Sequence, residues 1–297
     1  MNTAVHASHL CQEREDGNQT YIKQLFRSIR EETSEHAFWF YYNKPECKRI
    51  EASNFYHIHE EAPLAWTQRV FPSLLRRDAP DILFMPIQMM PIRKPRHLPS
   101  VVTIHDLAFL YYPRTFPLKD RVLHRLYVRW AVKHATHLIA ISQATKDDII
   151  KHYNVPEERI SVVYHGIDRE RFRLPQDSDN QRITQVQTKY GITKPYLLYI
   201  GNVQPRKNIT NLVRAFHHMK EAGYTDMQLV IAGAQAWRVQ DIFDSLGEHG
   251  THEDLIFTGR FEDADLPPLL WGSRGFILPS FYEGFGLPIL EAFACGV

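Results

Sequence analysis

Short apolar runs alternate with amphipathic stretches along most of this chain. The apolar runs are four to six residues long and rich in Val, Ile, Leu, Phe and Tyr, which predicts β-strands. Between two of them, Tyr21, Leu25 and Ile29 repeat with the spacing of one helical face. Strands that alternate with helices indicate parallel sheets covered by helices on both faces. The predicted strands are residues 3–8, 37–42, 82–85, 101–105, 138–142, 160–164, 196–200, 228–232, 255–258 and 275–279.

The alternation is interrupted by a polar and charged stretch at residues 169–194, which predicts a linker followed by a helix. A chain of 297 residues is also near the size at which a single hydrophobic core stops growing. We therefore predict an α/β protein of two doubly wound, Rossmann-like domains, residues 1–172 and 173–297. The last residues read as a helix that leads into a new strand, so we expect the second domain to be incomplete. Ligands of such folds bind beyond the carboxyl ends of the strands.

Composition limits the classes of binding partner and the cellular compartment that we expect. A net charge of +1 provides no overall field that would favour nucleic acid. No run approaches the 18 apolar residues of a membrane-spanning helix, and the first residues lack the basic and apolar segments of a signal peptide. The three cysteines, Cys11, Cys47 and Cys295, are odd in number and form no metal-type pair, which favours a reducing compartment. We expect a cytoplasmic protein.

A first candidate site follows the strand predicted at 196–200. The loop runs from Gly201 to Asn208 and contains Arg206 and Lys207, and an amphipathic helix begins after it. Asn208 is a good N-cap residue, and a helix N-terminus favours a phosphate group. Arg can bind phosphate oxygens in a bidentate manner, and Lys adds a point charge. A capped surface helix with two solvated cations explains the same residues about equally well.

A second candidate site follows the strand predicted at 275–279. Two glycines, Gly284 and Gly286, allow close backbone approach, and Pro288 suits the first position of a helix. Glu283 falls in the loop and Glu291 in the first turn of that helix. Two carboxylates at a strand-to-helix turn can accept hydrogen bonds from sugar hydroxyls, although an acid in a first turn is stabilising in any case.

With these two sites the sequence resembles the retaining family 4 (group 1) glycosyltransferases of the GT-B fold. The spacing from Glu283 to Glu291 matches the family's E-x(7)-E motif, and Pro-Arg-Lys-Asn at 205–208 matches its diphosphate site. Residues 163–168 and 102–106 are similar to two further family segments, so the resemblance covers nearly the whole chain.

The resemblance implies a role for each matching residue. Arg206 and Lys207 would bind the diphosphate beside Gly201 and Asn208, Glu283 would contact the donor sugar, and Glu291 the ribose hydroxyls. The amides of Phe285, Gly286 and Leu287 would approach the sugar or its phosphates. His105 would lie near the sugar, and residues 258–260 near the nucleobase.

One loop departs from the family pattern. The family's first loop often reads Gly-x-Gly-Arg, whereas residues 17–20 read Gly-Asn-Gln-Thr. Gly17 keeps its expected place near the donor, but the second glycine and the arginine are missing. Contacts from that loop to donor or acceptor are therefore in question.

The implied reaction transfers a hexose of mannose or glucose type, for example from GDP-mannose, to a glycan or a lipid-linked sugar in polysaccharide assembly. The anomeric configuration would be retained, and no cofactor or metal is expected.

Two D-x-D sequences, at 177–179 and 263–265, favour a solvated loop and a helix start over a metal site. The histidine-rich residues 57–61 favour a solvated strand or loop. Two alternatives stay open: an epimerase of the same fold that transfers no sugar, and an inactive fragment that only binds.

A cationic stretch in the first half remains outside these motifs. Residues 93–134 hold nine Lys or Arg against two Asp, with aromatic and apolar residues between them. One interpretation is a peripheral contact with anionic lipid at the inner face of the membrane, or with a lipid diphosphate acceptor. The other is a solvated basic face over a core helix.

Overall fold

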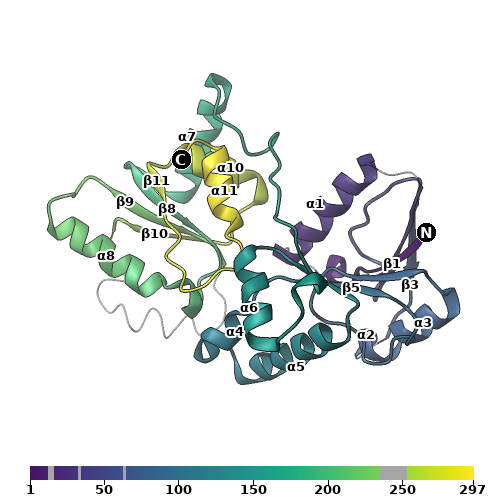
Figure 1. Ribbon diagram of the computed structural model, residues 1–297. Coiled ribbons are helices and arrows are strands. Elements are labelled where there is room, and N and C mark those ends of the chain that lie inside the picture. Colours follow the sequence, from purple (N-terminus) through teal and green to yellow (C-terminus); the bar gives the residue numbers. More distant parts are fainter. Residues whose placement is uncertain (13–16, 33–34, 63–64, 235–252) are drawn as a thin grey trace. The chain divides into compact units, whose positions relative to one another are not determined.

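The computed structural model of this chain describes residues 1–12, 17–32, 35–62, 65–234 and 253–297 (Figure 1). They divide into two compact units, one of residues 1–111 and 118–165 and one of residues 112–117 and 166–297. Phe172, which we placed at the end of the first domain, packs in a hydrophobic core of the second unit.

The first unit is built on a parallel sheet of seven strands in the order β3-β2-β1-β4-β5-β6-β7. The strands are β1 (Asn2–His6), β2 (Ala37–Tyr42), β3 (Phe55–His59), β4 (Ile82–Met85), β5 (Ser100–Ile104), β6 (His137–Ala140) and β7 (Ile160–Val162). The helices are α1 (Gly17–Glu32), α2 (Trp66–Arg69), α3 (Phe71–Asp78), α4 (Ala108–Tyr111), α5 (Leu118–His134) and α6 (Gln143–Tyr153). This order is doubly wound, and it reverses between β1 and β4.

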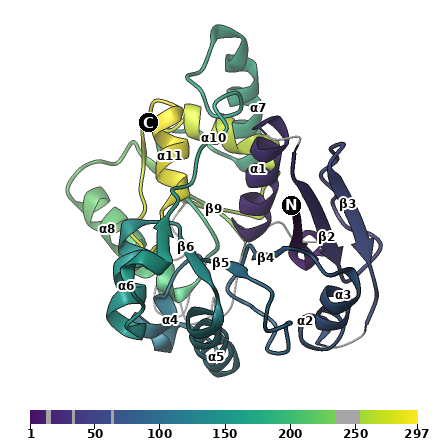
Figure 2. The same cartoon turned by 45° about the vertical axis from the view of Figure 1, so that its right-hand side comes forward.

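Alternate side chains of each strand pack against helices on opposite faces of this sheet. Val5 of β1 packs in the core that includes Phe26 of α1. The next residue, His6, points the other way and contacts the rings of Trp66 and Phe71 in α2 and α3. The strand period of two therefore places α1 on one face and α2 with α3 on the other, as Figure 2 shows.

The second unit repeats the arrangement with a parallel sheet of four strands in the order β10-β9-β8-β11. The strands are β8 (Tyr196–Ile200), β9 (Gln228–Ala232), β10 (Leu255–Gly259) and β11 (Gly275–Phe276). The helices are α7 (Asn180–Tyr190), α8 (Ile209–Glu221), α10 (Leu266–Trp271) and α11 (Leu287–Ala294). α8 packs on one face, and α7, α10 and α11 pack on the other. The two doubly wound parallel sheets predicted from the sequence are confirmed.

One strand is absent from the predicted set, and four were predicted to end two or three residues too late: β1, β6, β7 and β11. β3 carries the histidine-rich stretch as the edge strand of the first sheet, where His57 Nδ1 lies 3.0 Å from the hydroxyl of Tyr42. Two of its five residues are histidines, and only Phe55 is fully buried, so the hydrophobic pattern is weak there. β11 ends at Phe276 rather than at residue 279, because the chain then turns toward the β8–α8 loop.

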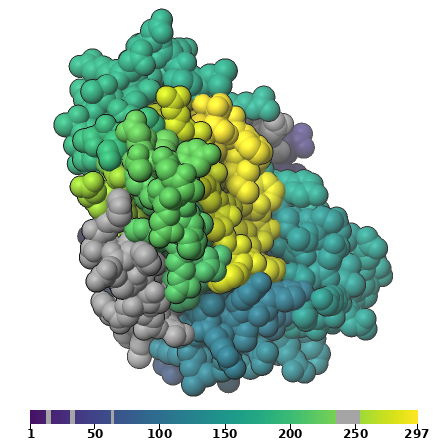
Figure 3. All heavy atoms as spheres, turned by 90° about the vertical axis from the view of Figure 1, so that its left-hand side faces the viewer, coloured from purple at the N-terminus to yellow at the C-terminus, as the bar shows by residue number. Residues whose placement is uncertain are grey.

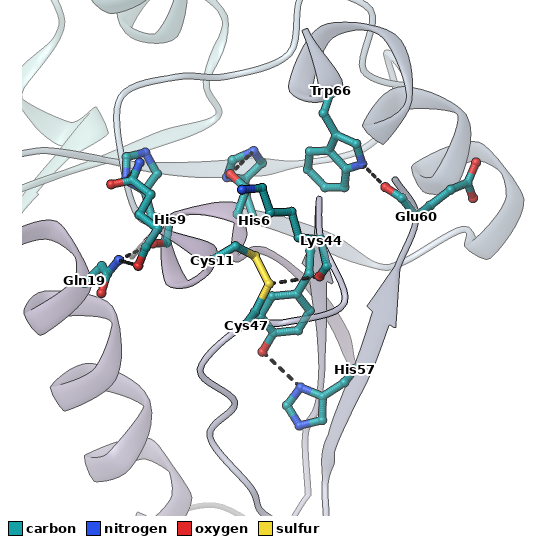
Figure 4. Close-up of a disulfide and its surroundings, with 12 residues drawn as sticks. His6, His9, Cys11, Gln19, Lys44, Cys47, His57, Glu60 and Trp66 are labelled. Carbon is teal, nitrogen blue, oxygen red and sulfur yellow. Dashed lines mark hydrogen bonds between the residues drawn. A yellow bond between two sulfur atoms is a disulfide. The ribbon is translucent and has the colours of Figure 1, made fainter. Parts of the chain in front are cut away.

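Cysteine pairing differs from the sequence expectation. Cys11 and Cys47 form a disulfide (Figure 4). Cys295 is free and buried. The pair meets because the chain after β2 returns to the end of β1, where the amide of Lys48 donates to the carbonyl of Leu10 at 3.1 Å. Spacing in the sequence carries no sign of this return.

The disulfide predicts the number of free thiols, which a thiol titration measures. Denatured, unreduced protein should titrate with one thiol, from Cys295, and reduced protein with three. Three thiols without reductant would contradict the pairing. If the pair is formed, Cys47→Ser should raise the count without reductant from one to two, because it releases Cys11.

Neither of the D-x-D sequences stands free. Asp179 caps the turn before α7 and accepts a hydrogen bond from Arg173 at 2.7 Å, and Asp265 accepts from Lys189 at 2.8 Å. Within the described ranges no helix has the length and apolar character needed to cross a bilayer. The same ranges hold no group of three His, Cys, Asp or Glu residues placed for a metal ion.

Candidate functional site

The order of strands in the second unit brings the two sequence motifs together. β8 and β11 are neighbours in the sheet, and the order reverses between them, which is where doubly wound folds bind ligands. The loop after β8 and the loop after β11 are joined by a hydrogen bond of 3.1 Å from the amide of Phe281 to the carbonyl of Arg206. Figure 3 shows the segment around α8 in green beside the C-terminal segment in yellow.

Both predicted phosphate-binding cations contact the predicted sugar-binding acid. Lys207 Nζ donates to Oε1 of Glu283, and Arg206 Nη1 lies 3.3 Å from its Oε2. Arg206 Nη1 also donates to the carbonyl of Tyr282 at 2.6 Å. The three side chains are only 12%, 15% and 22% exposed for Arg206, Lys207 and Glu283. They form one cluster of two cations around one carboxylate.

The electrostatics of the cluster keep Glu283 ionised. Burial by itself would raise the pKa of this carboxyl, but the charge of Lys207 and its hydrogen bond outweigh burial and hold the pKa below its usual value. The cluster then carries a formal charge of about +1 under the usual ionisation of Arg and Lys. Arg206 Nε is buried and has no hydrogen-bond partner among the described residues. A buried N–H of this kind is a donor available to an oxyanion.

Asn208 lies at the N-cap position of α8 as predicted, but its side chain does not cap the helix. Its backbone is left-handed, with φ of 60°, and its Nδ2 donates to the carbonyl of Pro279 at 3.1 Å. A left-handed N-cap residue cannot direct its side chain at the first helical amides as an extended one does. Asn208 instead ties the β8–α8 loop to the β11–α11 loop.

Two glycines shape these loops through close approach and positive φ. A Cβ on Gly201, with φ of +147°, would lie 2.8 Å from the hydroxyl of Tyr199. Gly286 has φ of +87° immediately before α11, a region that favours glycine. The turn sets the backbone of Phe285, Gly286 and Leu287 at the start of the helix.

Two predicted positions in α11 are corrected. The helix begins at Leu287, so Pro288 is its second residue rather than its first. No acidic residue lies in the first turn, and Glu291 falls in the second turn. The stabilising effect of an acid in the first turn of a helix therefore does not explain Glu291.

Glu291 is the most strongly perturbed carboxyl of the site region. Burial raises its pKa to about 7, the positive charge of Arg171 opposes this rise, and the negative charge of Asp263 adds to it. Arg171 is engaged with Asp263 through an ion pair of 2.7 Å. Glu291 is therefore poised to change its charge near neutral pH, which is common at ligand sites.

The first unit holds His105, directly after β5. Its Nε2 lies 2.7 Å from the carbonyl oxygen of Pro86, and Tyr21 sets its ring edge against both His105 and His165. The rings of His105 and His165 are stacked with centroids 6.2 Å apart. Burial, and then the charge of His105, lower the pKa of His165 to about 4. Gly17 lies at the start of α1 in the same unit, with open space around it.

Three residues of these two regions were not predicted. Arg171 was read as part of a polar linker, and its pairing with Asp263 is a contact across 92 positions of the chain. His165 stood in a segment that was noticed only by resemblance. Tyr112, which stacks on Phe281 with centroids 5.4 Å apart, lies in the short segment that belongs to the second unit. The only sequence signal for Tyr112 is that it is an aromatic residue within the basic stretch 93–134.

Two family models match the chain. Residues 17–171 match the model described as Glycosyltransferase Family 4, and residues 181–297 match the model described as Glycosyl transferases group 1.

Curated relatives and solved structures agree with these matches. O-antigen chain mannosyltransferase B of Escherichia coli is 35% identical over 202 residues, which are 67% of this chain and 51% of that protein. Alpha-D-kanosaminyltransferase of Streptomyces kanamyceticus is 28% identical over 65% of this chain and 50% of that protein. The chain spans about half the length of these relatives.

Among structures, HepE of Anabaena in complex with UDP and glucose superposes with a TM-score of 0.70 at 16% identity, covering 100% of this chain and 79% of that one. WaaG, a glycosyltransferase involved in lipopolysaccharide biosynthesis, gives 0.71 at 17%, covering 100% and 80%.

Proposed function

This chain belongs to Glycosyltransferase Family 4, and from that membership we propose that it is a retaining hexosyltransferase that uses a nucleoside diphosphate sugar. The donor sugar is of mannose or glucose type, with GDP-mannose as the first candidate. The mannosyltransferases among the relatives support this choice.

The observation that carries the proposal is the cluster of Arg206, Lys207 and Glu283. Two largely buried cations at a strand-order reversal form a site for a dianionic group. Glu283 holds the cations in place while the site is empty. A diphosphate that binds Arg206 and Lys207 replaces Glu283 as their ion-pair partner. Glu283 can then accept hydrogen bonds from sugar hydroxyls.

The proposed reaction forms a bond from the acceptor oxygen to the anomeric carbon and breaks the bond from that carbon to the diphosphate oxygen. The acceptor attacks from the side of the leaving group through an ion pair with oxocarbenium character, so the configuration is kept. The hydroxyl proton of the acceptor passes to a diphosphate oxygen. Arg206 and Lys207 stabilise the negative charge that grows on the diphosphate, and they do so without reorganisation because Glu283 and the carbonyl of Tyr282 already hold them.

The remaining site residues position the donor. The amides of Phe285, Gly286 and Leu287 approach the sugar or its phosphates, and Glu291 binds the ribose hydroxyls. His105 of the first unit acts on the sugar. The acceptor is a glycan or lipid-linked sugar of a surface polysaccharide, a choice supported by the O-antigen enzymes among the relatives. No metal is required, because the cations of the cluster supply the charge.

A calorimetric titration with GDP, UDP and ADP, each with and without chelator, tests the donor site. We expect saturable binding of one nucleotide, with an affinity that the chelator leaves unchanged. Binding that disappears with chelator would contradict the metal-free site, and absence of binding by all three would contradict the donor site itself.

Sugar transfer separates this proposal from an epimerase of the same fold. Incubation with the bound nucleotide sugar and a polysaccharide acceptor should release the nucleoside diphosphate in step with glycosylated product. An epimerase would convert the donor without any product on the acceptor.

A further inference from the structure

Helix α5 of the first unit exposes one face that changes from apolar to basic along its length. Leu118, Val122 and Leu126 repeat every four residues and are 66%, 47% and 60% exposed. Arg125, Arg129 and Lys133 repeat with the same spacing and begin two helical turns after Leu118, so they continue nearly the same face. Isolated exposed apolar residues are ordinary, but three on one helical face beside a cationic stripe form a patch.

The basic end of this face opens into a hollow between α5 and the end of α6. Its volume is about 770 Å³, and no Asp or Glu lines it. Its polar lining consists chiefly of side chains that are cationic or can donate hydrogen bonds: Arg125, Arg129, Lys133, His152, Tyr153 and Arg159.

Four of these donors are not engaged by the residues that the structure describes. Within the part of the chain that the structure describes, Arg125, Arg129 and Lys133 form no ion pair. The hydroxyl oxygen of Tyr153 is buried and lacks a hydrogen-bond partner among the same residues. A buried hydroxyl without a partner is unfavourable, and a ligand oxygen in the hollow would relieve this cost. Arg159 is held in place because its Nη2 donates to the carbonyl of Val132 at 3.2 Å.

We propose that this hollow binds the phosphate of an anionic phospholipid headgroup, while Leu118, Val122 and Leu126 enter the bilayer interface beside it. The ligand chemistry follows from the lining, since a phosphate diester offers acceptor oxygens and negative charge to Arg, Lys and Tyr donors. The lipid source follows from the apolar stripe on the same helix, which a soluble phosphate would leave in water. A basic amphipathic helix of this kind lies in the plane of a membrane surface.

This site is separate from the donor cluster, which lies in the other unit, and it requires neither donor nor acceptor. Its occupation would hold the first unit at a membrane, where lipid-linked acceptors of the proposed reaction reside. Vesicle binding without nucleotide therefore tests it independently of sugar transfer.

The test is sedimentation of the 297-residue chain with vesicles of phosphatidylcholine containing about one third phosphatidylglycerol, against vesicles of phosphatidylcholine alone. We expect binding to the anionic vesicles only, weakened by added salt. The double variant Arg125→Ala/Arg129→Ala should weaken this partitioning about 30-fold, because each basic residue near an anionic surface contributes about a five-fold factor. Leu118→Ser/Leu126→Ser should weaken it with the charges intact.

Arg27→Ala/Arg30→Ala is the matched control, since it removes the same charge from exposed positions on α1 of the same unit. It should keep its vesicle affinity within about two-fold, and circular dichroism should show that all variants are folded. Equal loss in both arginine pairs, equal binding to neutral vesicles, or no binding at all would overturn the proposal. Saturable binding of inorganic phosphate that depends on Arg125 and Arg129, without vesicle binding, would assign the hollow to a soluble anion instead.

Discussion

Lys207→Ala is expected to lower the turnover of sugar transfer by about 10²–10³, the usual effect of removing one charged donor from a preorganised site. Lys207 Nζ donates a hydrogen bond to Glu283 in a largely buried cluster. The variant therefore removes a positive charge beside the diphosphate and also leaves the carboxylate without this partner. Glu283→Ala is expected to abolish transfer. The measurement is turnover with a saturating donor and acceptor, together with the affinity for the nucleoside diphosphate.

Arg214→Ala provides the control for Lys207→Ala, because it removes an exposed cation from α8, the helix that begins beside Lys207. It should retain turnover and nucleotide affinity. Thermal unfolding of each variant separates loss of the site from loss of the fold. Near-normal turnover in both Lys207→Ala and Glu283→Ala, each folded, would show that the cluster is not the donor site.

Glu291→Gln is expected to raise the free energy of unfolding at pH 8 by up to about 3 kcal/mol, and by much less at pH 5. Burial raises the pKa of Glu291 to about 7 in the folded protein, from 4.5 when exposed. Between these values the folded state keeps a proton that the unfolded state has lost, so stability falls as pH rises through this window. Each pH unit of the window contributes about 1.4 kcal/mol, which sets the upper bound.

Urea unfolding at pH 5 and pH 8 measures this effect in the parent protein and in the variant. Glu170→Gln, at an exposed position of the same unit, is the control and should keep the pH dependence of the parent. An identical pH slope in the parent protein and in Glu291→Gln would show that Glu291 is not protonated when folded.

The same carboxyl should affect nucleotide binding with the opposite sign. Ribose hydroxyls donate to an ionised carboxylate better than to a protonated one. In its proposed role Glu291 therefore gives an affinity for the nucleoside diphosphate that increases from pH 6 to pH 8, beyond any change seen in Glu291→Gln. Parallel pH profiles for the two proteins would remove Glu291 from the ribose site while leaving the stability prediction intact.

Much of the fold could be predicted because its strands are local and strongly patterned. The predicted bounds of β2, β4, β8 and β9 agree with the structure to the residue. These strands are interior or well covered, and their apolar runs are bounded by polar residues. β3 and β11 were predicted poorly, since one is a half-polar edge strand and the other is only two residues long.

The candidate site could be predicted in its members but not in its contacts. Gly201, Arg206, Lys207, Glu283 and Gly286 all follow strands, which was sufficient to single them out. That Glu283 lies between the two cations depends on a contact across 76 positions. The side chain of Asn208 and the turn that holds Glu291 were predicted wrongly, because left-handed backbone at residue 208 and the true start of α11 are set by packing between two loops.

The sequence by itself determined the alternation of strands and helices, the two-sheet α/β class and the glycine- and charge-bearing loops. These features follow from local periodicity and backbone preference, which act over a few residues. Only the tertiary structure decided the strand order that joins β8 to β11, the pairing of Cys11 with Cys47, the pKa of Glu291 and the basic hollow beside α5. Each of these depends on which distant segments become neighbours and on how much water they exclude, and neither quantity is encoded in the spacing of residues along the chain.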